Sequence, residues 1–139
     1  MILEIGVTRE NKQHPHSITL DIKEGADIVT DLKHGIPLNE NSVDIVYISH
    51  VLEHIDSKDL DKVMKEIHRV MKKNTYLIIK VPHFSSRAYY STHQHITPFS
   101  LMTFLHWTGG HPERVDLFKI HSQTLHYKTE NIKGGKFKK

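Results

Sequence analysis

The sequence contains no cysteine among its 139 residues. This absence excludes disulfide bonds, zinc sites built from thiolates, and cysteine nucleophiles. Long apolar runs are also missing, because no segment approaches the roughly 20 apolar residues that a membrane-spanning helix needs. The first residues show no signal-peptide pattern. We therefore expect a cytoplasmic protein that has no membrane partner.

Neither sign of charge dominates the chain, in which 19 Lys and Arg face 16 Asp and Glu for a formal net charge of +3. A charge this small does not by itself indicate a nucleic-acid partner. The chain ends in a lysine-rich segment that suits phosphate contact or simply solubility, and only Phe137 stands there as a stacking aromatic. Its lysines are Lys133, Lys136, Lys138 and Lys139. A nucleic-acid partner stays open, with only these lysines in its favour.

The length suits one domain with a single core. We expect an α/β domain over residues 1–128, followed by a basic, flexible tail over residues 129–139. Short apolar segments rich in β-branched residues predict the strands of this domain. They are Met1–Ile5, Ile18–Ile22, Ala26–Thr30, Val43–Ile48 and Tyr76–Val81. Residues 115–128 alternate well enough for one or two closing strands, so we expect six or seven strands in all.

One segment, Ser57–Lys73, has clear helical periodicity. Its apolar residues recur at i, i+3, i+4 and i+7 and form one stripe that suits burial. They are Leu60, Val63, Met64, Ile67, Val70 and Met71. Asp56 or Ser57 can cap the start of this helix, and Asn74 suits the left-handed position after its end. We expect a second, short helix around Ser100–Trp107.

Only residues 6–17 separate the first two predicted strands, and Pro15 is among them. A crossover between parallel strands needs about a dozen or more residues and usually includes a helix. We therefore expect the first crossover helix to be shortened or missing. A strand-rich chain with crossover helices predicts an α/β fold with a mostly parallel open sheet that is flanked by helices.

Polar side chains gather where the fourth predicted strand ends. The apolar run Val43–Ile48 stops at Ser49 and His50, and a short linker with Glu53 and His54 leads to the helix. A buried strand that delivers polar groups at its carboxyl end, ahead of a helix, is how open α/β sheets present residues to a ligand. The sequence therefore predicts a ligand site at this edge of the sheet.

Five segments together resemble one family of enzymes: LEIG, TLDI, DIVTDL, SVDIVYISHVLEHI and KEIHRVMKKNTYLIIKVP. In order and spacing they are similar to small class I S-adenosylmethionine-dependent methyltransferases of the type-11 kind. The similarity runs from about Met1 to Pro82. It implies a Rossmann-like fold and methyl transfer from S-adenosylmethionine to a nitrogen or oxygen acceptor, with S-adenosylhomocysteine as the product. The sequence does not identify the acceptor, which is either a small molecule or a macromolecule.

The resemblance implies six cofactor-binding residues at the carboxyl ends of the first four strands. Glu4 and Gly6 match the positions that frame the amino-acid end of the cofactor. A carboxylate with two acceptor oxygens suits a ribose diol. The other matches are Asp21 at the ribose hydroxyls, Asp31 and Leu32 at the adenine, and Ser49 beside the methyl-sulfonium group.

The turn after the first strand departs from the family pattern of two or three glycines, since it reads Gly6-Val7-Thr8-Arg9. Side chains at these positions crowd a backbone that needs close approach to the ligand. The glycine-rich motif is therefore degenerate. This departure favours an alternative function, a non-catalytic binding or scaffold module that needs a partner. We expect no segment before the first strand to form a lid over the site, so in this alternative a partner subunit supplies the lid. A homodimer stays open as well.

His54 is the first candidate for the residue that activates the methyl acceptor, and His50 is the second. The resemblance implies this role, because some small-molecule methyltransferases place a histidine at this point after the fourth strand. An imidazole suits a general base near neutral pH. The alternative is that Glu53 and His54 only pin the loop to the following helix.

His50, Glu53 and His54 also spell H-x-x-E-H, a motif of one class of zinc hydrolases. Two histidines four apart on a helix can share one metal ion. That interpretation requires a helix through His50, which follows a β-branched strand. It also requires a distant third ligand such as Glu113 or Glu130. We therefore assign no metal ligands from the sequence.

Thirteen histidines is a high count for this length. Three of them, His83, His93 and His95, follow the fifth predicted strand among aromatic residues and Arg87. Such a mixture suits a substrate pocket above the sheet, a metal site, or an ordinary solvated loop. The role of residues 83–111 stays open at this point.

Overall fold

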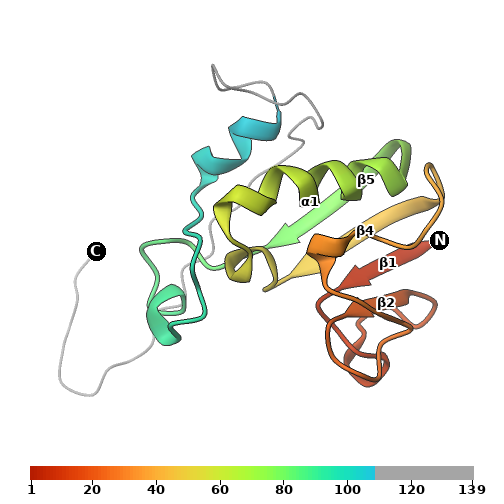
Figure 1. The fold of residues 1–139 in the computed structure, drawn as a ribbon, viewed down its shortest axis with the longest axis horizontal. Coiled ribbons are helices and arrows are strands. Elements are labelled where there is room, and N and C mark those ends of the chain that lie inside the picture. Colours follow the sequence, from red (N-terminus) through yellow and green to blue (C-terminus); the bar gives the residue numbers. More distant parts are fainter. Residues whose placement is uncertain (109–139) are drawn as a thin grey trace.

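The computed structural model describes residues 1–108, which form one five-stranded sheet with helices beside it (Figure 1). The strands lie in the order β3-β2-β1-β4-β5, and every neighbouring pair is parallel. Their bounds are β1 Ile2–Ile5, β2 Ile18–Asp21, β3 Ile28–Val29, β4 Val43–Ser49 and β5 Met71–Lys80. The predicted α/β fold with an open parallel sheet is confirmed. The strands predicted in residues 115–128 and the tail 129–139 lie outside the described residues.

The centre of the sheet is made by β1 and β4, whose inward residues are almost fully buried. Leu3 and Ile5 on β1 lie in register with Val46 and Ile48 on β4, and none of the four side chains is more than 1% exposed. Successive side chains on a strand point to opposite faces. This apolar row therefore defines the face of the sheet that carries the core.

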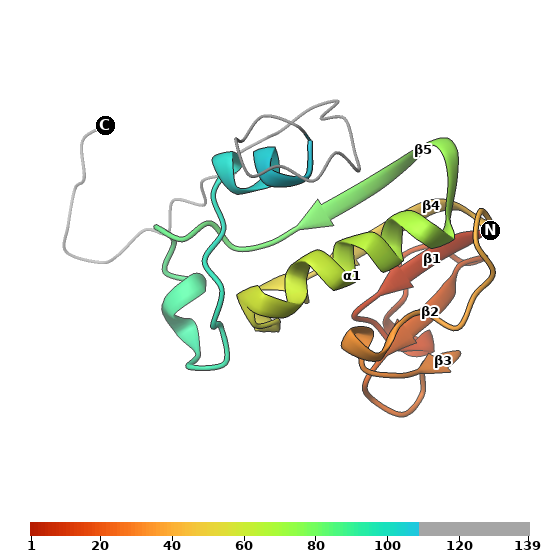
Figure 2. The same cartoon turned by 45° about the horizontal axis from the view of Figure 1, so that its top comes forward.

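The helix α1, Ser57–Val70, covers this core face (Figure 2). The Asp56 side chain accepts a hydrogen bond from Lys58 N, as expected of a helix cap. The predicted apolar stripe is buried over the whole length of the helix, namely at Leu60, Val63, Met64, Ile67 and Val70. Burying such a stripe is what stabilises a helix of this length, because its own propensity contributes little.

The predicted end of α1 is wrong by three residues, since the helix stops at Val70 instead of Lys73. Met71 already has extended backbone and pairs with Val43 of β4. Asn74 does adopt the left-handed conformation, with φ of 59°, but it does so inside β5. There the register shifts between Val43 and Ile45, the residue paired with Tyr76. Asn74 therefore lies in the irregular part of β5 and does not end the helix.

The connection between β1 and β2 contains only the 3-10 helix η1, Arg9–Asn11. The prediction that the first crossover helix is shortened is confirmed. The short helix expected around Ser100–Trp107 is the 3-10 helix η5, Leu101–Trp107, which Ser100 caps. Three further 3-10 helices are η2 Leu32–His34, η3 Leu52–His54 and η4 Tyr89–Ser91.

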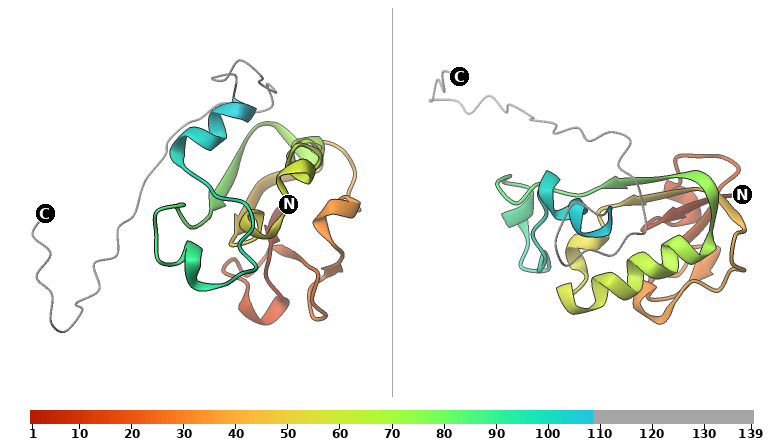
Figure 3. Two further views of the ribbon diagram at one scale, coloured as in Figure 1. Left: turned by 60° about the vertical axis from the view of Figure 1, so that its left-hand side comes forward. Right: turned by 90° about the horizontal axis from the view of Figure 1, so that it is seen from above.

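The two faces of the sheet are covered unequally (Figure 3). The core face carries α1, and η5 is tied to it where Trp107 Nε1 donates to the Asp61 carboxylate at 2.8 Å. Over the other face passes the loop 6–17, where the His14 ring stacks on Tyr47 with centroids 4.1 Å apart. Tyr76 and Ile78 on β5 stay exposed by 56% and 44%. Within residues 1–108, no helix is long and apolar enough to cross a bilayer.

Candidate functional site

The carboxyl ends of the parallel strands bring most of the predicted site residues to one edge of the sheet. Gly6 follows β1, Asp21 ends β2, Asp31 follows β3 and Ser49 ends β4. Because all five strands run in the same direction, these positions share an edge. In open α/β sheets ligands bind outside this edge. A ligand site at this edge would therefore lie along the strand ends from β3 to β5.

Glu4 lies one residue before the end of β1 and is only 3% exposed. Its carboxylate accepts hydrogen bonds from Gln13 N at 2.9 Å, His14 N at 2.8 Å and Ser17 Oγ at 2.7 Å. Burial alone raises the pKa of this carboxyl group, but the hydrogen bonds outweigh burial and the pKa lies below its usual value. Both oxygens of Glu4 thus hold the loop 6–17, and they are not aimed at a ligand.

Gly6 is a position that only glycine fits. Its φ is +90°, and a Cβ built on it would lie 2.2 Å from Cγ2 of Val51 and 3.1 Å from the Ser49 carbonyl oxygen. In a glycine-rich turn this space is what a cofactor approaches. Here the side chain of Val51 fills it. The end of β1 is therefore close-packed against the residues after β4.

Asp21 and Asp31 each use one carboxylate oxygen to accept a backbone hydrogen bond. Asp21 Oδ1 accepts from Lys23 N at 3.0 Å, and within residues 1–108 its Oδ2 has no hydrogen-bond partner. Asp31 caps η2 by accepting from Lys33 N at 3.0 Å, while Oδ2 lies 3.5 Å from Lys33 Nζ. Leu32, the next residue, packs into the core at 5% exposure. The two carboxylates are acceptors that suit hydroxyl and amino groups, whereas the Leu32 side chain is buried.

The end of β4 places a histidine against a buried carboxylate. His50 has a left-handed backbone with φ of 54°, and its amide donates to the Lys80 carbonyl at 2.9 Å. Its Nδ1 lies 3.2 Å from Oε1 of Glu53, which is fully buried, whereas the His50 side chain is 51% exposed. The imidazole is therefore held at one nitrogen and open to solvent at the other.

His54 belongs to a different contact, with the loop that follows β5. Its Nδ1 lies 3.1 Å from the Gln94 carbonyl oxygen, and its ring meets the ring of His95 edge-on with centroids 4.8 Å apart. One ligand atom from each of Glu53, His54 and His95 lies within 4.8 Å of the others. The sequence did not predict that His95 joins this pair, because the chain must return from β5 to bring it there.

The H-x-x-E-H interpretation is wrong for His50. That motif requires His50 and His54 on one helix, but the left-handed backbone of His50 breaks any helix before η3 begins. The group of possible metal ligands found within residues 1–108 contains His54 and Glu53 with His95, and it does not contain His50. The proposed third ligands, Glu113 and Glu130, lie outside the described residues.

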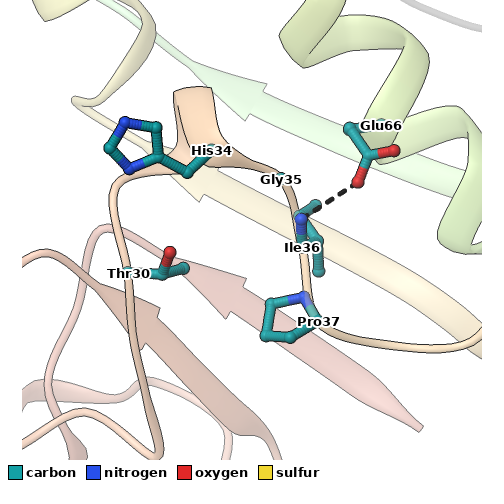
Figure 4. A pocket seen from close by; sticks show the side chains of 6 residues that line it. All are labelled: Thr30, His34, Gly35, Ile36, Pro37 and Glu66. Carbon is teal, nitrogen blue, oxygen red and sulfur yellow. Dashed lines mark hydrogen bonds between the residues drawn. The ribbon is translucent and has the colours of Figure 1, made fainter.

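A shallow pocket of about 240 Å³ lies between the segment that follows β3 and the helix α1 (Figure 4). Its lining is Thr30, His34, Gly35, Ile36, Pro37 and Glu66. Sites for whole small molecules usually measure about 300–1,000 Å³, and Glu66 in this pocket is already occupied by accepting from Ile36 N at 3.0 Å. The pocket is therefore too small for a whole nucleoside cofactor.

A parallel sheet with carboxylates at the ends of β2 and β3 and a histidine after β4 defines an open α/β domain with polar groups at one edge. The sequence matches the family described as "Methyltransferase domain" over residues 5–79, more than half of the chain. The chain belongs to this family. No curated protein sequence matches it.

Solved structures support the fold. A SAM-dependent methyltransferase from Archaeoglobus fulgidus aligns with a TM-score of 0.62 and 25% identity, over 74% of this chain and 56% of that chain. A complex between the Haloferax volcanii Trm112 methyltransferase activator and a putative methyltransferase contains a chain that aligns with a TM-score of 0.56 and 16% identity, over 75% and 57%. This chain thus spans little more than half the length of either.

Proposed function

We propose that this chain binds S-adenosylmethionine and transfers its methyl group to a nitrogen or oxygen acceptor. The observation that supports this most is Oδ2 of Asp21 at the carboxyl end of β2, which has no hydrogen-bond partner within residues 1–108, in a chain that belongs to the methyltransferase family. A ribose diol has two hydroxyl donors, and a carboxylate with a free oxygen is the acceptor it needs. Asp31 and Leu32 would meet the adenine from the end of β3.

The two ends of the cofactor are served differently by this chain. The nucleoside half would meet Asp21, which uses only Oδ1 within residues 1–108, and Asp31, whose Oδ2 lies 3.5 Å from Lys33 Nζ. The amino-acid half meets a Glu4 carboxylate that is fully used by its own loop, and a Gly6 surface that Val51 covers. The residues present therefore fit the nucleoside well, and we assign Glu4 to shaping the turn and not to direct binding.

The cofactor, when bound, supplies an electrophilic methyl group on sulfur, and the chain's task is to hold and deprotonate the acceptor. His50 suits the deprotonation better than His54 does. The Glu53 carboxylate can only accept, so it fixes the proton on His50 Nδ1 and leaves Nε2 as the basic nitrogen. Glu53 also balances the positive charge that the ring gains when it takes a proton. Glu53 is thus a positioning residue, and Ser49 lies next to the reacting end.

The first test is calorimetric titration of the full chain with S-adenosylhomocysteine and S-adenosylmethionine. The Asp21→Asn variant keeps Oδ1 for Lys23 N but removes the charge and one acceptor oxygen. We expect micromolar binding that this change weakens by at least about tenfold, since hydrogen bonds to charged groups contribute about 1.5–3 kcal/mol. Glu40→Gln is the matched control, because Glu40 is an exposed carboxylate that precedes β4 at the opposite edge of the sheet.

Equal weakening by both variants would show that only net charge matters, and it would reject the Asp21 site. Absence of binding at millimolar ligand would instead favour a domain that requires a partner subunit, by analogy with the Haloferax chain that was solved with an activator. If binding is found, single-turnover methylation of candidate acceptors by His50→Gln and His54→Gln variants ranks the two histidines. Binding of S-adenosylhomocysteine must persist in both for the ranking to hold.

A further inference from the structure

A second cluster of chemistry-bearing side chains lies where η3 meets the loop after β5. Glu53 and His54 come from η3, and His95 comes from residues 83–100, beyond the part of the chain that matches the family. One ligand atom from each lies within 4.8 Å of the others. We propose that Glu53, His54 and His95 bind a divalent transition-metal ion of the zinc type.

The hydrogen bonds of the two histidines leave the correct nitrogen free for a metal. A backbone carbonyl can only accept, so His54 Nδ1 carries its proton toward Gln94 O at 3.1 Å, and His95 Nδ1 does so toward Tyr89 O at 2.8 Å. In each ring Nε2 then carries no proton, so its lone pair can bind a metal ion. Metal-bound histidines almost always hold their other nitrogen against a carbonyl or a carboxylate in this way.

The buried Glu53 carboxylate would be stabilised by a bound cation. Its side chain is fully buried, and within residues 1–108 its Oε2 has no hydrogen-bond partner. Oε1 lies 3.9 Å from His95 Nε2. With Nδ1 of His95 protonated, this places a carboxylate oxygen opposite a nitrogen lone pair, two groups that do not attract each other. A cation bound by the Glu53 carboxylate and His95 Nε2 removes the repulsion and gives the buried charge its partner.

The donor set and its spacing fit such an ion. Two imidazoles and one carboxylate form a common zinc-binding set that keeps a fourth position open. Metal–ligand distances of about 2.0–2.2 Å put the ligand atoms of a tetrahedral site roughly 3.3–3.6 Å apart. The three ligand atoms lie within 4.8 Å of one another, and Glu53 Oε1 lies 3.9 Å from His95 Nε2, so small side-chain movements bring them to this spacing. The exposed ring of His54 also gives the ion a path from solvent.

The backbone around the cluster is already fixed without an ion. The Glu53 carbonyl accepts from Ile96 N at 2.9 Å and Thr97 N at 3.2 Å, and Thr97 Oγ1 donates to Ile55 O at 2.6 Å. These bonds hold the loop of His95 against η3. A site that is ordered before binding loses little entropy when the ion arrives.

This inference goes beyond methyl transfer and does not rest on it. Glu53 Oε1 already accepts from His50 Nδ1, whereas Oε2 is the oxygen without a partner, so an ion and the His50 contact can use different oxygens. A bound ion would prevent His54 from taking up a proton, and it would leave His50 as the base. Metal binding is measurable in the absence of S-adenosylmethionine.

The experiment uses the full chain after removal of metals with a chelator, and Zn²⁺ and Co²⁺ as probes. We expect one equivalent of Zn²⁺ to bind with submicromolar affinity in competition with a chromophoric chelator. Co²⁺ should give the visible absorption bands of a low-symmetry, four-coordinate ion. His95→Ala and His54→Gln should each weaken binding by at least about tenfold, since even loss of a supporting contact around a metal commonly costs 10–100-fold.

His93→Ala is the matched control, because His93 is an exposed histidine of the same loop that is not part of the cluster. It should bind Zn²⁺ as the unchanged chain does, and Mg²⁺ should not compete. Circular dichroism of each variant verifies that it is folded. Binding that is weaker than about 0.1 mM, or that His93→Ala lowers as much as His95→Ala, overturns the proposal and leaves a hydrogen-bonded histidine pair.

Discussion

The Ser17 hydroxyl donates a 2.7 Å hydrogen bond to Oε1 of Glu4, which ties the residue before β2 to the end of β1. In the family pattern that the sequence resembles, a glycine-rich turn and a helix occupy this connection. Here the loop 6–17 is instead held by hydrogen bonds to one buried carboxylate, that of Glu4. The same carboxylate also accepts from the amides of Gln13 and His14. The stability of the loop 6–17 should therefore depend on the negative charge of Glu4.

Glu4→Gln tests that dependence. Since the pKa of Glu4 is lowered in the folded protein, the unfolded chain takes up a proton more readily than the folded one. The contribution of Glu4 to stability is then fully present above the unfolded pKa, about 4.3 for glutamate. It disappears as the pH falls through the lower folded value. At pH 7 we expect the variant to lose about 1–3 kcal/mol of unfolding free energy.

Urea denaturation followed by circular dichroism at pH 7 and at acidic pH measures this effect. The gap between the unchanged chain and Glu4→Gln should narrow as the pH drops toward 3. Glu10→Gln, an exposed residue of η1, is the control and should differ little at either pH. A gap that stays constant from pH 7 to pH 3 would mean that the charge of Glu4 is irrelevant.

Gly6→Ala should destabilise the domain by about 2–4 kcal/mol. One part is backbone strain, because φ is +90° at this position. The other part is a clash, since the new Cβ would lie 2.2 Å from Val51 Cγ2. A double-mutant cycle with Val51→Ala separates the two by thermal or urea unfolding. The clash should vanish in the double variant and the strain should remain, so complete additivity of the two changes would contradict this packing.

The sheet and the main helix could be predicted from the sequence because each is encoded by a local pattern. The stripe Leu60–Val70 has a period that only one face of a helix satisfies, and β4 is rich in β-branched apolar residues. The end of α1 could not be predicted. Met71 fits the helical stripe as well as it fits a strand, and it is long-range pairing with Val43 that decides. Boundaries set by tertiary contacts leave no local signal.

The site could be predicted only where its residues follow strand ends. Asp21 and Asp31 lie where a parallel sheet must place them. The cluster of Glu53 with His95 depends on how the chain returns after β5, which no short-range spacing specifies. The cofactor-binding role of Glu4 that the resemblance implies stays a prediction, and its hydrogen bonds to the loop 6–17 could not be predicted because they depend on how the shortened connection folds back.

Adenosine should bind almost as tightly as S-adenosylhomocysteine. The nucleoside half would meet Asp21 and Asp31, but the amino-acid half has lost the open glycine surface, which Val51 covers. We expect the two dissociation constants to differ by no more than about tenfold, or roughly 1.4 kcal/mol. Competition calorimetry measures both under one condition, with methionine as the control that should not compete. A preference above a hundredfold for S-adenosylhomocysteine would show that the amino-acid end is well bound after all.

Arg69→Lys should loosen the loop that leads into β4. The Arg69 guanidinium grips Glu66 through two nitrogens, at 2.8 and 3.0 Å, and also donates to the carbonyls of Leu38 and Ile36. A lysine has no planar fork and can replace only some of these bonds. We expect a loss of about 1–2 kcal/mol in urea unfolding. Lys65→Met, at an exposed position of the same helix, should change stability by less than about 0.5 kcal/mol.

Because the Arg69 guanidinium lowers the pKa of Glu66, the contribution of the Arg69–Glu66 ion pair to stability should be present at neutral pH and fade below about pH 4.3. A difference between the chain and Arg69→Lys that persisted unchanged at pH 3 would place the effect in packing of the arginine stem and not in the ion pair.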